Sequence, residues 1–200
     1  MKKRILKKQR ILYEGDFLQL VREGPWEYVQ RKNCSGVVVI VPLTQDEKAV
    51  FVEQRRVPVG GNVIEFPAGL VEDHNLVRRE SLEAAAQREL LEETGYHAEH
   101  LEHLVSGPAA SGLSCEIVAF YRACCLEKRG PGGGVELESI LVHEIPLKRA
   151  EVWLKRMEKK GKRIDPKVYI GIYFLNAAVR MRHSKKKTRL ARRSQAFLPR

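Results

Sequence analysis

The chain lacks long apolar runs and is poor in aromatic residues. Aromatics make up 7% of its 200 residues, and charged residues interrupt the 44% that are hydrophobic into short segments. A membrane-spanning helix needs about 20 consecutive apolar residues. No stretch of the sequence approaches that length, so we expect no membrane-spanning helix. A chain of this size can instead form one domain with a substantial core.

Cysteine pairs at the spacing of zinc sites are also missing. The four cysteines are Cys34, Cys115, Cys124 and Cys125, and the adjacent pair lies in an apolar, strand-like run. This pattern favours reduced, packed thiols in a cytoplasmic protein. The basic N-terminus, MKKRILKKQRIL, has neither a long apolar core nor a small-residue cleavage site, so we do not expect a secretory signal.

Acidic residues are absent from both ends. Residues 1–10 contain six Lys or Arg and residues 180–200 contain nine, with no Asp or Glu in either segment. Removing these fifteen charges from the net charge of +11 leaves about −4 for the remaining body. Two readings of the basic C-terminal segment stay open. It is either a solvated, flexible tail, or a surface that binds RNA or another polyanion through salt-sensitive attraction.

The most informative segment is ESLEAAAQRELLEETGY, which begins at Glu80. Ser81 is a good N-cap, the interior is rich in helix formers, and Gly95 follows where a left-handed residue ends a helix. At about 100° per residue, Leu82, Ala85 and Ala86 form an apolar face. One turn later, acidic residues continue that face: Glu89 and Glu93, with Glu92 at its edge.

Carboxylates on an inward-facing stripe repel one another and cannot be buried as bare anions. A hard divalent cation resolves this conflict, because carboxylate oxygens are the ligands that Mg²⁺ and Mn²⁺ prefer. The alternative is an ordinary solvated acidic face. Since the apolar stripe leads directly into Glu89 and Glu93, we expect a metal site on this helix.

At these residues the chain resembles the Nudix hydrolase family. Glu80, seven further residues, and the run from Arg88 to Tyr96 match the second part of the family's sequence box without exception. The first part differs, because ten residues instead of five separate Gly69 from Glu80. The loop before the helix is therefore five residues longer than usual, including 74–79, while the metal-binding part is intact.

The resemblance implies a set of metal-binding and supporting residues. Glu89 and Glu93 would bind Mg²⁺ or Mn²⁺, and Glu92 would bind a second ion directly or through water. The carbonyl of Ala68 would add a further ligand. Arg88 would hold a box glutamate in place, and Glu80 would either bind metal or orient Arg88. Such a site implies hydrolysis of a nucleoside diphosphate linked to another group.

The segment VEQRRVPVGGNVIEFPAGLVED resembles the branch of the family that hydrolyses ADP-ribose and nucleoside diphosphate sugars. There, Arg55 or Arg56 would grip phosphate through a planar guanidinium, although a plain surface arginine pair is the alternative. The resemblance implies further substrate contacts at Glu65, Ser111 and Glu116. The usual Ser-Pro-Gly turn is replaced by 110–112, so a sugar nucleotide is as plausible as ADP-ribose.

Two regions outside the box complete the predicted site. Trp26 and Tyr28 alternate on one strand and would stack on the base, often from the partner subunit of a homodimer; simple burial is the alternative. The glycine-rich segment 130–134 would let an acidic loop swing toward the metals, making Glu138, or else Glu136, the general base. Solvated loop charges are the alternative for both glutamates.

The order of strand and helix patterns predicts an α/β/α sandwich with a mixed sheet, as the resemblance implies, plus a small N-terminal antiparallel β region. We divide the chain into residues 1–34, the hydrolase domain at 35–179, and the tail at 180–200. The predicted activity converts a nucleotide sugar into a nucleoside monophosphate and a sugar phosphate. Alternatives are RNA 5′-end or dinucleoside polyphosphate hydrolysis, and a regulator that binds a nucleotide sugar without cleaving it.

Overall fold

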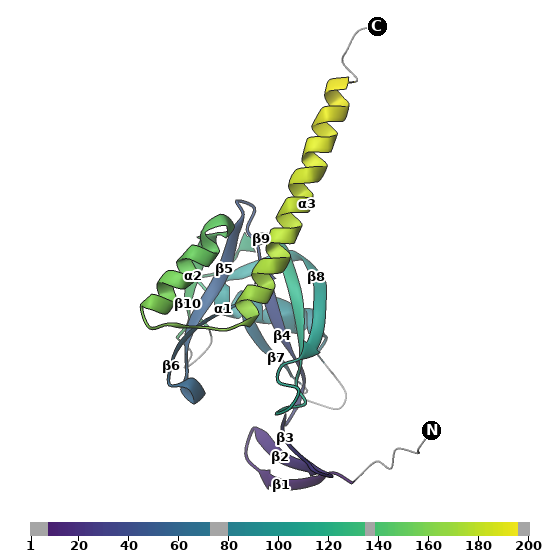
Figure 1. Cartoon of the computed structure of the whole chain (residues 1–200), viewed down its shortest axis with the longest axis vertical. Coiled ribbons are helices and arrows are strands. Elements are labelled where there is room, and N and C mark those ends of the chain that lie inside the picture. Colours follow the sequence, from purple (N-terminus) through teal and green to yellow (C-terminus); the bar gives the residue numbers. More distant parts are fainter. Residues whose placement is uncertain (1–7, 73–79, 135–138, 196–200) are drawn as a thin grey trace, which may run out of the picture.

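A computed structural model describes residues 8–72, 80–134 and 139–195, with side chains for most of them. The strands form three sheets (Figure 1). The first is an antiparallel N-terminal sheet of β1 (Arg10–Glu14), β2 (Leu18–Glu23) and β3 (Trp26–Arg31). Figure 1 shows it at one end of the molecule, joined to the body where β4 begins.

Two four-stranded mixed sheets form the body. One has the order β7-β4-β9-β8, and the other has the order β10-β5-β6-β11. Their strands are β4 (Cys34–Pro42), β5 (Lys48–Arg56), β6 (Gly61–Glu65), β7 (Ala68–Glu72), β8 (Tyr96–Pro108), β9 (Ile117–Lys128), β10 (Leu141–Pro146) and β11 (Arg163–Ile164). The pair β4–β9 is parallel, as is β6–β11, whereas β4–β7 and β5–β6 are antiparallel.

Three α-helices cover these sheets: α1 (Leu82–Thr94), α2 (Ala150–Lys159) and α3 (Lys167–Gln195). Short 3₁₀ turns lie at η1 (Val57–Val59) and η2 (Leu147–Arg149). The turn η2 leads directly into α2. The predicted α/β/α sandwich with an N-terminal antiparallel sheet is confirmed.

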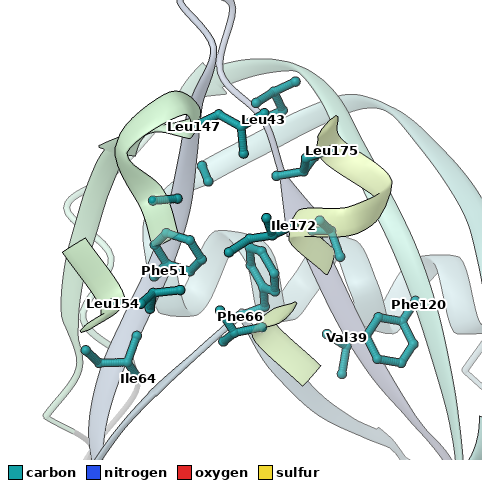
Figure 2. Packing of buried hydrophobic residues seen from close by; sticks show 14 of the residues in the cluster. Val39, Leu43, Phe51, Ile64, Phe66, Phe120, Leu147, Leu154, Ile172 and Leu175 are labelled. Atoms are coloured by element: carbon teal, nitrogen blue, oxygen red, sulfur yellow. The ribbon is translucent and has the colours of Figure 1, made fainter. Parts of the chain in front are cut away.

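The core has two parts, one on each side of the β7-β4-β9-β8 sheet. Alternate residues of β4 separate them, because Val39 and Val41 face α2 and α3 while Val38 and Ile40 face α1. Figure 2 shows the larger part, where Phe51 and Phe66 pack among Leu154, Ile172 and Leu175. Its rings are close, with 5.0 Å between the centroids of Phe51 and Phe66.

The inward face of α3 consists of Val168, Ile172 and Leu175, which are buried, and Val179, which is partly buried. The helix continues to Gln195, through most of the basic segment at 180–200, and extends away from the body (Figure 1). Residues 180–195 contain no Gly or Pro, which lets the helical backbone continue. Within the described residues, no helix combines the length and apolar character of a membrane span.

Candidate active site

The acidic helix α1 forms with the caps that the sequence predicts. The side chain of Ser81 accepts a hydrogen bond from the backbone N–H of Ala84 at 3.1 Å. At the other end Gly95 adopts φ 73°, and its N–H donates to the carbonyl of Leu91. Lys128 adds a donor there, with its Nζ 2.7 Å from the Thr94 carbonyl, which suits the negative end of the helix dipole.

The buried face of α1 includes carboxylates as well as apolar side chains. Ala85, Ala86 and Leu90 are fully buried, and Glu93 is only 4% exposed, whereas Leu82 lies at the edge of this face. The predicted continuation of an apolar stripe into acidic residues is therefore observed. A carboxylate buried to this degree needs close partners to remain charged.

Arg88 lies among three of the box carboxylates. Its Nε and Nη2 each donate to one oxygen of Glu80 at 3.0 Å, while Nη1 donates to Glu89 at 2.8 Å and to Glu92 at 3.3 Å. Nη2 also donates to the carbonyl of Leu70 on β7 at 3.1 Å. The bonds to Glu80 and the charges around it raise the pKa of the Arg88 guanidinium above its ordinary value. Arg88 thus fixes the carboxylates to one another and the helix to β7.

Glu89 and Glu93 meet the chain at Ala68 and Gly69. Oε2 of Glu93 accepts a hydrogen bond from the backbone N–H of Ala68 at 3.1 Å. The Glu89 carboxylate lies against Gly69, where an added Cβ would come within 1.9 Å of its Oε1 and Cδ. Only glycine permits this approach, which explains the residue after Ala68. The predicted role of the Ala68 carbonyl as a metal ligand stays a prediction.

This donor set fits a hard divalent cation in its chemistry, because it consists of carboxylate and carbonyl oxygens. Across the described ranges, no group of three or more His, Cys, Asp or Glu is arranged to hold a metal ion. Glu80, Glu89 and Glu92 each direct at least one carboxylate oxygen at Arg88. The residues beside Ala68 and Gly69 therefore suit a divalent cation by their chemistry, although their side chains are not arranged as a complete set of metal ligands.

The glycine-rich segment is held against the end of α1, a role that the sequence did not suggest. The N–H groups of Gly133 and Gly134 donate to the carbonyls of Glu93 and Glu92 at 2.9 and 3.1 Å. An added Cβ on Gly132 would lie 2.4 Å from the carbonyl carbon of Thr94. These glycines thus permit close approach and cap the helix, instead of simply allowing motion. Glu136 and Glu138 lie outside the described residues, as does the extended loop at 74–79.

The predicted phosphate-binding arginines differ in their surroundings. Nε of Arg56 donates to Glu65 at 2.8 Å, whereas Arg55 is exposed at the end of β5. Burial raises the pKa of the Glu65 carboxyl, and the nearby Arg56 opposes that shift. The charge of Asp165, just before α3, also raises the pKa of Glu65, whereas the charge of Lys167 lowers it. The sequence analysis did not identify this cluster, because its members come from distant segments.

The remaining predicted substrate residues meet at the N-terminal sheet. Trp26, Tyr28 and Ser111 line one pocket of about 360 Å³, together with Glu23, Gly112, Ser114 and Cys115. Trp26 is 61% exposed, so simple burial does not describe it. Glu116 lies nearby but its carboxylate pairs with Arg31. Backbone hydrogen bonds join β3 to this loop, including the N–H of Val29 to the carbonyl of Leu113 at 2.8 Å.

Comparison with known proteins identifies a family match and several similar proteins. Residues 35–166 match the NUDIX domain. The methanol dehydrogenase activator of Bacillus methanolicus is 34% identical over 74% of this chain and 76% of its own length. GDP-mannose pyrophosphatase of Yersinia pestis (strain Pestoides F) is 31% identical over 83% and 82%. The ADP-sugar pyrophosphatase of Mus musculus is 45% identical over 38% and 37%.

A solved structure shows the same fold. The crystal structure of an ADP compounds hydrolase superposes with a TM-score of 0.68 at 18% identity, covering 88% of this chain and 94% of that one. Nudix proteins typically use divalent metal ions, which agrees with the oxygen-rich donor set on α1. The NUDIX domain match covers more than half of this chain, and the box carboxylates lie on α1. The chain therefore belongs to the Nudix hydrolase family and is a pyrophosphatase acting on phosphoric anhydrides.

Proposed function

We propose that the protein hydrolyses the diphosphate bond of a nucleoside diphosphate sugar or of ADP-ribose. Water adds to one phosphorus atom, the bridging P–O bond breaks, and the products are a nucleoside monophosphate and a sugar phosphate. The observation that carries this proposal is the approach of Glu89 and Glu93 to Ala68 and Gly69, with Arg88 holding the neighbouring carboxylates.

Glu89, Glu93 and Glu92, with the Ala68 carbonyl, are the residues that would hold Mg²⁺ or Mn²⁺. When bound, such an ion neutralises charge on the diphosphate oxygens and acidifies a water molecule. Arg88 contributes position, because its bonds to Glu80, Glu89 and the Leu70 carbonyl restrain the acidic side chains from both sides. We assign Arg88 as a positioning residue, with Glu80 as its anchor.

Arg56 and Arg55 are the cations that would meet the diphosphate or the terminal ribose. The Arg56–Glu65 pair joins the last residue of β5 to the last residue of β6, and Glu65 comes three residues before Ala68 in the chain. Relatives named for GDP-mannose and ADP-sugar hydrolysis support a sugar nucleotide as the substrate class. We keep Glu138, or else Glu136, as the general base, and contacts from Ser111 and Glu116 as predictions.

The base-stacking role of Trp26 and Tyr28 also stays a prediction. These residues lie on the N-terminal sheet, at the opposite end of the molecule from the extension of α3 (Figure 1). In the branch that the sequence resembles, such aromatic residues often come from the partner subunit of a homodimer.

A substrate panel tests the proposed function. Purified protein would be incubated with ADP-ribose, GDP-mannose, a UDP-hexose, a dinucleoside polyphosphate and capped RNA, each with Mg²⁺ or Mn²⁺. We expect a nucleoside monophosphate and a sugar phosphate in equal amounts from at least one of the first three compounds. Release of product only from capped RNA or the dinucleoside polyphosphate would contradict the proposal.

A further inference from the structure

The helix α3 carries many basic residues and no acidic one. Nine of its 29 residues are Lys or Arg, and the sequence contains no Asp or Glu after Asp165. Eight of these nine cations lie from Arg180 onward, in the second half of the helix. Residues 11–179, by contrast, have a net charge of about −4. The positive charge is therefore concentrated on one element and not spread over the molecule.

The basic half of α3 begins where the helix leaves the body. Val179 still packs against the core, and Arg182 lines a pocket of about 310 Å³ together with Arg122 of β9. Nε2 of His183 then lies 3.0 Å from Oε1 of Glu47. Beyond this point α3 extends away from the body, and no other element of the described chain runs beside it (Figure 1). This part of the helix is a surface that the protein's own elements do not cover.

Helical geometry places most of these basic positions on one side of the extension. At about 100° per residue, six of them fall within an arc of about 120°. These six positions, which we call the basic stripe, are Arg182, Lys185, Lys186, Arg189, Arg192 and Arg193. At about 1.5 Å per residue the stripe is roughly 16 Å long. The other two cations, Arg180 and Lys187, occupy positions on the opposite side of the helix.

Such a stripe is unfavourable in the protein alone. Like charges three or four positions apart on a helix repel each other, and the stripe contains six pairs at this spacing, such as Arg182 with Lys186. No acidic residue in α3 offsets them. The negative end of the helix dipole stabilises cations only in the last turn, which explains Arg192 and Arg193 but not the others. Contact with a polyanion would relieve the repulsion along the whole stripe.

The other residues of the extension distinguish between kinds of polyanion. A helix that lies on a membrane surface needs a broad apolar face. The only large apolar residues in 180–195 are Met181 and Leu190, whose positions lie on opposite sides of the helix. Proteins that bind unpaired bases stack them on aromatic rings, and this segment contains no Phe, Tyr or Trp. Both a lipid surface and a single strand therefore fit poorly.

A nucleic-acid duplex fits the stripe in charge density. It carries one phosphate charge per roughly 1.7 Å of its axis, or about ten over the length of the stripe. Six cations in a row can therefore each lie near a phosphate. Contacts of this kind need neither an apolar face nor aromatic rings, because they involve the backbone and not the bases.

We propose that the basic stripe binds the phosphate backbone of an RNA or DNA duplex without reading its sequence. The α1 carboxylates lie in the body of the protein, whereas the stripe lies on the extension of α3 (Figure 1). The duplex is thus a partner that holds the enzyme in place, and not the substrate of the hydrolase site. This inference does not depend on which diphosphate the enzyme cleaves.

Two double variants test the stripe at equal net charge. Lys186→Gln with Arg189→Gln removes one lysine and one arginine from the stripe. Arg180→Gln with Lys187→Gln removes the same two residue types from the opposite side. Glutamine has a helix propensity close to that of both residues, so α3 should persist in each variant. Circular dichroism and thermal unfolding of the full chain check this point.

The measurement is fluorescence anisotropy of labelled RNA and DNA duplexes, titrated with the full chain at several salt concentrations. With about six phosphate contacts, the slope of log K against log salt should be roughly −5 for wild type. The stripe variant should lose two contacts, which brings the slope to about −3.6 and weakens binding roughly tenfold. The opposite-side variant should stay within about twofold of wild type, because a helix about 10 Å wide separates its cations from the duplex and salt screens them.

Three results would overturn the proposal. One is equal weakening in the two variants, which would mean attraction by net charge without a binding face. Another is failure of the wild type to bind either duplex. The third is tighter binding to single-stranded RNA, or to vesicles containing phosphatidylserine, than to both duplexes. If the proposal holds, the duplex that binds more tightly identifies the partner.

Hydrolysis provides an independent readout of the same variants. Both should cleave free nucleotide sugars at the wild-type rate, and a loss confined to the stripe variant would place the stripe in the hydrolase site and contradict its role as a separate surface. The anisotropy titrations need no turnover. Wild-type protein that binds a duplex but cleaves no nucleotide sugar would therefore refute the proposed function alone.

Discussion

Two buried glutamates in this protein have opposite surroundings. Glu93 on α1 is 4% exposed and Glu53 on β5 is 6% exposed. Around Glu53, three donors converge on one carboxylate: Lys162 Nζ at 2.6 Å, Asn62 Nδ2 at 2.8 Å and His143 Nε2 at 3.1 Å. Beside Glu93, by contrast, three further carboxylates converge on one arginine, Arg88.

The difference separates a structural site from a reactive one. Burial alone would raise the pKa of Glu53, but its hydrogen-bond donors and the charge of Lys162 bring it down to about 2. That group is satisfied and joins β5, β6, β10 and the segment after α2. On α1, by contrast, carboxylates lie side by side along one face, which is an arrangement that a hard cation stabilises. Burial of a carboxylate thus does not by itself indicate function, because Glu53 is nearly as buried as Glu93 and has structural partners.

The largest effect should come from Glu93→Gln. We expect kcat/KM to fall roughly a thousandfold, or about 4 kcal/mol of transition-state stabilisation, because the amide cannot bind a hard cation as a carboxylate does. The amide oxygen still accepts from the Ala68 N–H, so the free energy of unfolding should change by about 1 kcal/mol or less. Rate measurements and urea unfolding check the two halves of this prediction.

Glu83→Gln is the control for that variant. Glu83 lies in the first turn of the same helix and accepts a hydrogen bond from the Tyr121 hydroxyl at 3.1 Å. Its activity should stay within about twofold of wild type. Equal losses in the two variants would mean that general damage to α1, and not a ligand role of Glu93, explains the result.

Arg88→Lys should have the next largest effect. A lysine ammonium cannot bridge Glu80, Glu89 and the Leu70 carbonyl as the planar guanidinium does. We expect kcat/KM to fall about a hundredfold and the Mg²⁺ concentration for half-maximal rate to rise about tenfold. Arg22→Lys, which alters an exposed pair with Glu27, should change neither quantity. A normal metal requirement in Arg88→Lys would contradict the positioning role.

Local signals in the sequence predicted most of the α1 region. Ser81, Gly95 and the apolar stripe fixed the helix and the face on which its carboxylates lie, since each depends on near neighbours along the chain. Contacts between distant segments were not predictable in this way. Examples are the caps from Gly133 and Gly134, and the hydrogen bond from the Asp165 N–H to the Ile64 carbonyl at 3.0 Å.

The segment VEQRR illustrates the same limit. Its pattern indicated a substrate-binding hairpin, and Arg56 does lie beside Glu65. Yet Glu53 in that segment points to the α2 side of the sheet and binds Lys162 and His143, which lie 109 and 90 residues further along the chain. Alternation along a strand places successive side chains on opposite faces, but the partners on each face depend on the tertiary fold.

Glu53→Gln tests whether Glu53 contributes to stability and not to activity. We expect the free energy of unfolding at neutral pH to fall by about 2 kcal/mol, less than for a fully buried pair, because Lys162 is partly exposed and can reach water. The activity of the folded enzyme should be unchanged. A large loss of kcat without loss of stability would place Glu53 in the site instead.

The pH dependence of that difference gives a further check. The folded-state pKa of Glu53, about 2, lies below its ordinary value of 4.5, so its contribution to stability is fully present above that value. The contribution is lost as the pH falls from 4.5 toward 2. Urea unfolding of wild type and Glu53→Gln should therefore converge across this window. A constant difference across it would contradict the linkage.

The smallest effect should come from His143→Phe, which tests one of the three donors alone. The His143 ring lies 5.0 Å from the ring of Trp153, so phenylalanine keeps the aromatic contact and removes the hydrogen bond to Glu53. Lys162 and Asn62 still satisfy the carboxylate, and we expect a loss of about 1 kcal/mol in urea unfolding. His103→Phe is the control, because His103 also packs on an aromatic ring, that of Tyr121, but lies on the exposed surface of β8. If His143→Phe were as harmful as Glu53→Gln, the carboxylate would depend on all three donors as a unit. The buried network would then be cooperative, and its members could not be treated as separate contributions.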